Sequence, residues 1–252
     1  MAKRLPKGVL VVFEGIDGAG KTTQARALVE SLCSSGYDAV YSKEPTDGPW
    51  GRKIRASAES ERMPLAEELD AFLADRKEHC ADFLIPALDA GRIVILDRYY
   101  YSTAAYQGER GANPDDILRV NEEFAPQPDA LFILEIPIDV SMDRIRTRGY
   151  AVNQFEKKEA LARCAEIFCA INRPYVRRID GCRSIEEIAY DILIAIQEGP
   201  IRISEWSADA GKVSQETFFK IMSQVRRIQE DNSVPVSDKA EAVRAMALRE
   251  LS

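Results

Sequence analysis

Short runs of apolar, β-branched residues alternate along the chain with longer segments in which apolar residues recur at helical spacing. The short runs predict strands at residues 9–13, 38–42, 92–96, 131–136 and 175–179. The helical patterns cover residues 22–32, 50–58, 64–90, 113–124, 139–148, 155–171 and 184–197. Strands that alternate with helices in this way predict a five-stranded parallel sheet with helices on both faces, which is a three-layer α/β fold.

The pattern changes after residue 198. Residues 199–252 carry no strand signal and two helical patterns, at 215–229 and 238–251, joined by a polar link. We therefore expect one α/β domain over residues 1–198 and a small helical C-terminal extension over residues 199–252. Because so short a segment buries little apolar surface by itself, we expect it to dock on the main domain or on a partner.

The loop between the first strand and the first helix carries the clearest chemical signal. It fits the phosphate-loop pattern G-x-x-x-x-G-K-[ST], which makes the expected fold that of the P-loop nucleoside triphosphatases. Glycines allow a tight turn in which successive backbone N–H groups point at one phosphate, and the helix N-terminus adds partial positive charge. A plain glycine turn would explain neither Lys21, which can reach the outer phosphates, nor Thr22, which can hold Mg²⁺. The residues expected to bind the phosphates are Gly15, Ile16, Asp17, Gly18, Ala19, Gly20, Lys21, Thr22 and Thr23.

Polar residues close several of the predicted strands. Glu14, Lys43, Asp97 and Glu135 fall at or just beyond strand carboxyl ends, where open parallel sheets bind their ligands. On the long third helix, Phe72 and Arg76 are four residues apart and share one face. An aromatic ring beside a forked donor suits a flat base with an acceptor edge, although each residue alone is also typical of packing or a solvated charge.

Composition restricts the partners that the chain can have. The net charge of −7 and pI near 5.1 argue against a nucleic-acid-binding surface. The apolar run after the basic N-terminus is too short for a signal peptide or a membrane span, so we expect no membrane partner. Five cysteines and one histidine favour reduced thiols in the cytoplasm over a disulfide scaffold or a zinc site. His79 is expected to be a surface or packing residue rather than a catalytic one.

Several stretches, in order along the chain, resemble the thymidylate kinase family. Residues 13–24 resemble its phosphate loop, and residues 69–76 resemble its base-binding helix. Asp97-Arg98-Tyr99 and Ala105-Tyr106-Gln107-Gly108 resemble its DRY and AYQG signatures, while Glu44-Pro45 and residues 51–55 fit its second loop and helix. The resemblance spans roughly residues 8–197 and is more specific than the phosphate loop alone.

The resemblance implies an enzyme that transfers a phosphoryl group from ATP to dTMP, with Mg²⁺ as cofactor, for dTTP synthesis. Thr22 and Asp97 would hold the metal, and Asp180 and Gly181 would lie beside the adenine. The residues implied to bind dTMP are Asp17, Arg55, Phe72, Arg76, Arg98, Thr103, Tyr106 and Gln107. Of these, the two arginines Arg55 and Arg98 would grip the monophosphate. A homodimer is the common state of such relatives.

Within that group, Phe72 would stack on the thymine, while Arg76 and Gln107 would read its polar edge. Asp17 would bind the sugar 3′-hydroxyl, and Tyr106 would disfavour a 2′-hydroxyl.

The chain departs from the family pattern in two places. Lys43 and Thr46 stand where many bacterial relatives have Arg and Gly. An arginine near the transferring phosphate is also hard to place, because Gly18-Ala19 and Gln154 occupy the positions that carry it in eukaryotic and bacterial relatives. Arg146 and Arg148 are the nearest substitutes, in a lid expected over residues 146–155 with Gly149 as its flexible point. The catalytic residues implied are Lys21, Arg98, Asp97, Arg146 and Arg148.

Two alternatives to a dTMP kinase stay open. One is a kinase for another deoxynucleotide or a deoxynucleoside. The other is a nucleotide-binding module that has lost catalysis, because loss of a transition-state arginine can cost on the order of a thousandfold in rate.

Overall fold

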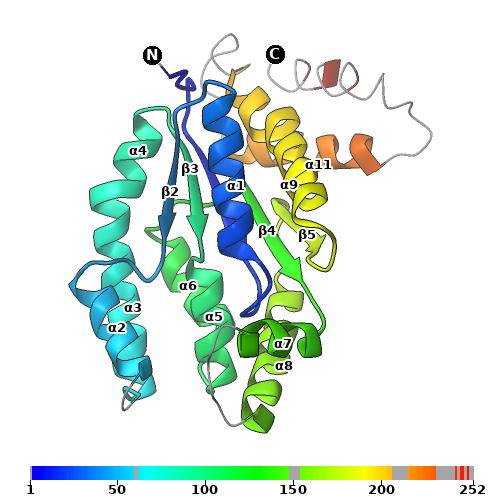
Figure 1. The fold of residues 1–252 in the computed structure, drawn as a ribbon. Coiled ribbons are helices and arrows are strands. Elements are labelled where there is room, and N and C mark those ends of the chain that lie inside the picture. The colour runs from blue at the N-terminus through cyan, green and yellow to red at the C-terminus, as the bar shows by residue number, and fades with distance from the viewer. Residues whose placement is uncertain are drawn as a thin grey trace.

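The fold is an α/β sandwich built on a single parallel sheet. The computed structural model describes residues 2–59, 62–147, 154–205 and 215–230, together with residues 242, 245, 246 and 249. All five strands pair in parallel, in the order β2-β3-β1-β4-β5 (Figure 1), which confirms the predicted sheet. The strands are β1 (Val9–Glu14), β2 (Ala39–Lys43), β3 (Ile93–Asp97), β4 (Ala130–Glu135) and β5 (Val176–Asp180).

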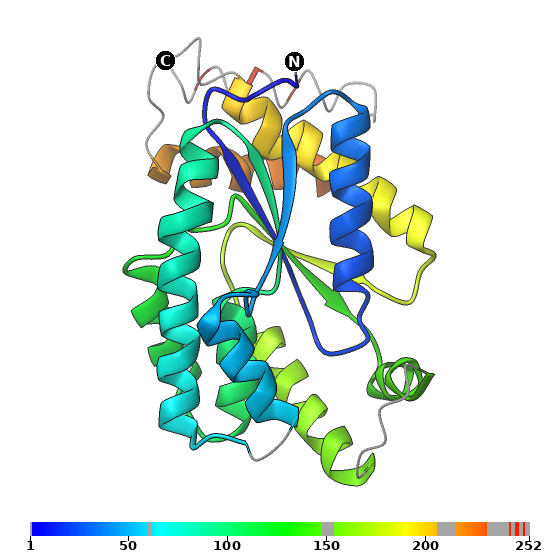
Figure 2. The same ribbon diagram turned by 60° about the vertical axis from the view of Figure 1, so that its left-hand side comes forward.

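Helices cover both faces of the sheet (Figure 2), with α1 and α9 packed together on one face and the α3–α4 helix on the other. The first helices are α1 (Lys21–Ser34), α2 (Pro49–Glu59), α3 (Leu65–His79), α4 (Ile85–Asp89), α5 (Tyr100–Glu109) and α6 (Pro114–Glu122). The later ones are α7 (Ile138–Thr147), α8 (Gln154–Ala170), α9 (Ile185–Ile196) and α11 (Gln215–Glu230). The three-layer prediction is therefore confirmed.

Two features of the helices were not expected from the sequence. Helix α5 follows β3 directly, and its Tyr100, Tyr101, Ala104 and Ala105 are fully buried, so its sequence lacks the polar stripe that marks a surface helix. The predicted long helix runs from α3 into α4 through a π-helical turn at Cys80–Leu84. Such a turn inserts one residue into the helical register and often lies near a functional site.

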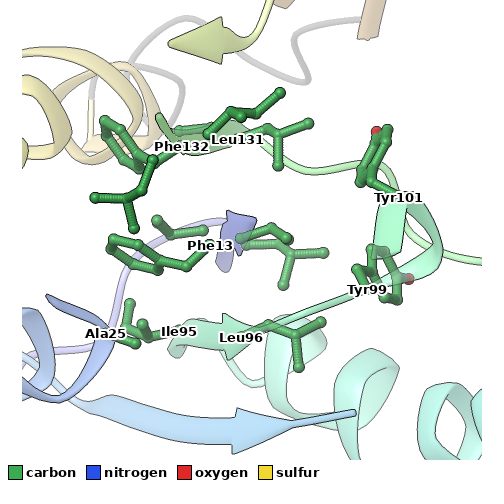
Figure 3. Close-up of a cluster of buried hydrophobic side chains, with 14 of the residues drawn as sticks. Phe13, Ala25, Ile95, Leu96, Tyr99, Tyr101, Leu131 and Phe132 are labelled. Carbon is green, nitrogen blue, oxygen red and sulfur yellow. The ribbon is translucent and has the colours of Figure 1, made fainter. Parts of the chain in front are cut away.

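The central strand β1 explains why the phosphate loop occupies the middle of the site. It pairs with β3 on one side and β4 on the other, and every one of its residues is buried. Phe13 lies between residues of the two neighbouring strands and stacks on Phe132 with ring centroids 5.5 Å apart (Figure 3). This packing fixes the end of β1, and with it the start of the phosphate loop.

The chain beyond α9 stays attached to the α/β body. The helix continues through a π-helical turn (Gln197–Ile201) that is kinked at Gly199, and Ile201 and Ile203 are each 1% exposed. Ser204 Oγ donates to Lys7 O at 2.6 Å and accepts from Lys7 N at 3.1 Å. Helix α11 matches the first helical pattern of the extension; most of the second lies outside the described residues. The domain division at residue 198 stays a prediction.

Two expectations from the sequence concern the cysteines, expected to be reduced thiols, and membrane-spanning segments, of which none was expected. All five cysteines are free. Among the described residues, no helix is long and apolar enough to cross a membrane.

The buried carboxyl group of Asp129 makes the stability of the fold depend on pH. Its Oδ2 accepts a hydrogen bond from Leu10 N at 2.8 Å in the strand β1. Burial raises the pKa of Asp129 from 3.8 to about 6, although Lys7 and the Leu10 N–H act in the opposite direction. The folded state therefore holds this proton more tightly than the unfolded chain, and stability falls as the pH rises from about 4 to about 6.

We expect Asp129→Asn to remove this dependence, because the amide keeps an acceptor oxygen and carries no charge. Urea unfolding at pH 4 and pH 7 measures it: relative to the wild type, the variant should gain about 2 kcal/mol between the two pH values. The exposed control Glu123→Gln should change by less than about 0.5 kcal/mol. Equal pH profiles for the wild type and Asp129→Asn would contradict the assignment.

Candidate active site

The phosphate loop has the backbone geometry that the motif predicts. Gly15 has φ +133°, and a Cβ atom there would lie 2.4 Å from Leu134 O, so only glycine fits. Lys21 begins α1 and is 5% exposed, and its Nζ donates to Gly15 O and Ile16 O at 2.9 Å each. Burial, and then the charge of Arg98, lower the pKa of Lys21 to about 8. An anion bound at the loop would raise the pKa of Lys21 again, because a nearby negative charge favours the ammonium form.

A pair of oxygen ligands lies beside the loop, at the end of β3. Thr22 Oγ1 donates to Asp97 Oδ2, and the Tyr41 hydroxyl donates to the same oxygen at 3.2 Å. The other oxygen, Oδ1, is buried and has no hydrogen-bond partner in the described part of the chain. Burial and the Asp97 charge raise the pKa of Tyr41 to about 12, so it remains a donor.

These residues fit a magnesium ion. A hydroxyl and a carboxylate are oxygen ligands of the kind that Mg²⁺ takes, and Mg²⁺ usually keeps several waters and phosphate oxygens besides one or two protein ligands. The described residues contain no group of three or more His, Cys, Asp or Glu side chains that could hold a metal by themselves. Thr22 and Asp97 are therefore suited to a metal that arrives with a polyphosphate.

Arg98 joins the phosphate loop to the rest of the site. It has φ +69°, in the left-handed region that a non-glycine residue seldom adopts, and such strain is typical of functional positions. Its Nη2 donates to Asp17 Oδ1 at 2.5 Å, and its Nη1 donates to Ser102 Oγ at 3.2 Å. The guanidinium also lies over the Tyr106 ring, 5.3 Å from its centroid. These contacts hold the guanidinium between the phosphate loop and α5.

Glu14, the last residue of β1, holds this strained turn in place. It is fully buried, and its Oε1 accepts hydrogen bonds from Tyr99 N at 2.7 Å and Ser102 N at 3.0 Å. Its Oε2 accepts from Ser102 Oγ at 2.6 Å. The carboxylate thus satisfies the free backbone donors at the start of α5. Burial raises the pKa of Glu14, while the Ser102 hydrogen bond and the Arg98 charge oppose this shift.

Asp17 is ionised and faces a cavity. Its Oδ1 accepts from Arg98 and from the Tyr106 hydroxyl at 3.1 Å. Burial acts to raise its pKa, but the charges of Arg98 and Lys21 outweigh burial and lower the pKa to about 2. The side chain is still 38% exposed, so a ligand can reach the carboxylate.

The cavity beside the phosphate loop has a volume of about 240 Å³. Its walls come from α2, α3 and α5 and from the loop after β2, at the carboxyl ends of the strands. The residues that the resemblance implied for dTMP all line it: Asp17, Arg55, Phe72, Arg76, Arg98, Thr103, Tyr106 and Gln107. Residues spread over some ninety positions of the sequence thus meet around one space.

Arg76 is the most tightly held of these residues. It is 1% exposed, and its Nε donates to Glu44 Oε2 at 2.8 Å. Its Nη1 donates to Asn121 Oδ1 at 2.7 Å, and its Nη2 donates to Thr103 Oγ1 at 3.1 Å. Gln107 lies in the same wall, and its Oε1 is buried without a hydrogen-bond partner among the residues described. The wall therefore offers fixed donors and an acceptor to a flat polar ligand.

Arg55 lies in α2, lines the cavity and is held by the loop after β2. Arg55 donates to Pro45 O and to Asp47 Oδ1, each at 2.9 Å. Thr46, noted above as a departure from the family pattern, donates through its backbone N and its hydroxyl to Asp75 at 2.8 and 2.6 Å.

Of the two expected lid arginines only Arg146 belongs to the described part of the chain, and it is not among the residues that line the cavity. Arg146 is 71% exposed and pairs with Asp143 at 3.0 Å. Arg148 and Gly149 lie outside the described residues, as does the side chain of Gln154. Gly181 does approach the phosphate loop, because a Cβ atom there would lie 3.2 Å from Ala19 O.

Sequence reasoning missed several residues that shape the site. Arg144 donates to Gly18 O and to Gly181 O, both at 3.1 Å, and so ties the phosphate loop to the loop after β5. Tyr41, on β2, donates to Asp97 at the end of β3. His79, expected to be a surface or packing residue, is buried and hydrogen-bonded. No local pattern marks these residues, since each contact joins segments distant in the sequence.

A phosphate loop beside a base-sized, arginine-lined cavity defines a P-loop enzyme of the nucleotide kinase class. A family model described as thymidylate kinase matches residues 13–192. The chain therefore belongs to the thymidylate kinase family, as the resemblance implied.

Individual relatives agree with this assignment. A thymidylate kinase of Desulfotalea psychrophila is 45% identical over 193 residues, which cover 76% of this chain and 95% of the relative. One of Xanthomonas campestris pv. campestris is 43% identical over 214 residues, covering 84% of this chain and 94% of the relative. One of Xylella fastidiosa is 46% identical over 184 residues, which cover 73% of this chain and 84% of the relative.

Two replacements of Glu14 distinguish what its hydrogen bonds contribute to stability from what its charge contributes. Glu14→Ala leaves three donors at the start of α5, one buried and two partly buried, without their acceptor, so we expect a loss of about 3 kcal/mol in the free energy of unfolding. Glu14→Gln keeps an acceptor for the two backbone N–H groups and should lose less than half as much. Urea unfolding at pH 7 measures both; equal losses would show that the α5 N-terminus does not depend on this acceptor.

Proposed function

We propose that this protein transfers the terminal phosphoryl group of ATP to dTMP, giving ADP and dTDP for dTTP synthesis. The observation that carries the proposal is the cavity, because its lining contains each residue that the family pattern assigns to the acceptor. Membership of the thymidylate kinase family supports the same reaction.

On the donor side, the phosphate loop would hold the ATP phosphates through its backbone N–H groups and Lys21. Thr22 and Asp97 would hold Mg²⁺, which when bound neutralises charge on the phosphates. Phosphoryl transfer depends chiefly on alignment and on such neutralisation. Lys21 Nζ already lies at the loop, where it donates to two backbone carbonyls that a phosphate would replace as its partners.

On the acceptor side, Arg98 and Arg55 would bind the monophosphate, since guanidinium groups bind phosphate in a bidentate manner. Phe72 would stack on the base, and Arg76 would donate to its carbonyl edge while Gln107 completes the polar contacts. Asp17, kept ionised by Arg98 and Lys21, is a strong acceptor for a sugar 3′-hydroxyl.

The phosphates of the two substrates would meet in front of Arg98. Arg98 pairs with Asp17 of the phosphate loop and also lines the cavity, so it lies between the donor and acceptor sites. Closure of residues 146–155 would exclude water, which would otherwise hydrolyse ATP. For Arg146 to serve the transferring phosphate, it would have to leave Asp143.

We also propose a cytoplasmic homodimer in which residues 199–252 dock on the main domain. Five free cysteines support a reducing compartment. The burial of Ile221 and Val225 in α11 supports docking.

An acceptor panel tests the proposed reaction. Purified protein with ATP and Mg²⁺ should form dTDP from dTMP with a higher kcat/KM than for dUMP, dCMP, dGMP or thymidine. Lys21→Ala should lower kcat on the order of a thousandfold, because a charge that stabilises the transferring phosphoryl group is lost. Arg183→Ala, which removes an exposed ion pair with Asp191, should leave the rate unchanged.

Two results would contradict the proposal. If calorimetry shows that ATP and dTMP bind but no dTDP forms, the protein is a nucleotide-binding module. A higher kcat/KM for another acceptor would identify a different kinase.

A further inference from the structure

A chain of hydrogen bonds leads from strand β2 to Arg76. Ser42 Oγ lies 2.8 Å from His79 Nε2, and His79 Nδ1 lies 3.0 Å from Glu44 Oε1. The other carboxylate oxygen, Glu44 Oε2, accepts from Arg76 Nε at 2.8 Å. The side chains of His79, Glu44 and Arg76 are 5%, 2% and 1% exposed, so water does not compete for the two bonds to Glu44, while the bond to Ser42 is partly buried.

The protonation of His79 follows from its partners. The Glu44 carboxylate, paired with Arg76, can only accept, so Nδ1 carries a proton and donates to Oε1. In the neutral ring Nε2 is then the acceptor and takes the proton of the Ser42 hydroxyl. The ring is also held by Phe83, which stacks on it at 5.7 Å with an interplanar angle of 13°. His79 is thus a fixed donor to Glu44.

The helix is built so that His79 and Arg76 act on the same carboxylate. They are three residues apart in α3, hence on one face, together with Phe72 of the cavity wall. The π-helical turn begins at the next residue, Cys80, and shifts the register there. Leu84, the last residue of the turn, and Ala87, beyond it, pack in the hydrophobic core instead.

Both oxygens of Glu44 are occupied, one by His79 and one by Arg76, so the carboxylate has no free rotation. Arg76 is bound at Nε by Glu44 and at Nη1 and Nη2 by Asn121 and Thr103. Nη1 carries two N–H groups and Asn121 accepts from one of them, which leaves a second donor on a residue that lines the cavity. The direction of that donor depends on the plane in which Glu44 holds the guanidinium.

We propose that His79 is a positioning residue for base selection, which acts through Glu44 to orient Arg76 toward a pyrimidine carbonyl oxygen. The inference rests on the proposed function, because it takes dTMP as the ligand of the cavity. Without His79, Glu44 Oε1 would lose its donor, and the carboxylate would turn toward another one. The Arg76 guanidinium would turn with it and lose its alignment with the base.

Calorimetric titration of dTMP, without ATP, tests this in the full-length protein. His79→Phe keeps the ring packing and removes both nitrogens; it should raise the dTMP Kd about tenfold, equal to about 1.4 kcal/mol. His79→Asn, whose amide can replace the Nδ1 donor, should stay within about threefold of the wild type. In steady-state assays the KM for dTMP should rise in His79→Phe while the KM for ATP does not. The preference for dTMP over dCMP should also fall, since cytosine presents an amino group in place of the carbonyl.

A stability control separates positioning from simple loss of packing. Leu84→Ala removes a fully buried side chain from the same continuous helix; it should lower the free energy of unfolding and leave the dTMP Kd unchanged. Wild-type affinity in His79→Phe, or equal weakening in His79→Asn and His79→Phe, would overturn the inference. Failure of the proposed function gives a different result from failure of the His79 inference: the wild-type protein would bind dTMP and form no dTDP from it.

Discussion

The ion pair between Asp17 and Arg98 connects the two halves of the site. Asp17 belongs to the phosphate loop and Arg98 follows β3, so the pair fixes the loop against the cavity wall. Arg98 reaches this position only with a left-handed backbone, which Glu14 stabilises through the amides of Tyr99 and Ser102. Charges that are partly withdrawn from water interact strongly, and removal of one partner leaves the other uncompensated. The site therefore depends on a charge balance as much as on shape.

This balance also explains how an acidic protein can bind two anionic substrates. The chain carries a net charge of −7, yet Arg55 and Arg98 line the cavity, and Lys21 of the phosphate loop interacts with the charge of Arg98. In the free protein their charges are met by Asp17, Asp47 and the loop carbonyls. A phosphate could replace these partners one by one, so that binding exchanges ion pairs instead of exposing unpaired cations. We expect the field to be local, with little attraction for extended polyanions.

The features that the sequence predicted are those with a local pattern. Strand β1 is buried on both faces and therefore reads as an unbroken apolar run, and the phosphate loop is marked by residue type and spacing. Helix α5 could not be recognised in the same way, since Tyr100, Tyr101, Ala104 and Ala105 are all fully buried. The π-helical turn at Cys80–Leu84 has no sequence signature either. Contacts such as Arg144 to Gly181 and Tyr41 to Asp97 arise only when the sheet brings distant segments together.

The phosphate loop and the cavity form one continuous site, in which we expect the phosphate chains of donor and acceptor to meet. The decisive measurement is the affinity of a bisubstrate analogue, with adenosine and thymidine joined through five phosphates. Its Kd should lie at least a hundredfold below that of ATP or dTMP alone, because binding of one end places the other at high effective concentration. A Kd no lower than that of ATP alone would show that the loop and the cavity are not occupied together, and that they are separate sites.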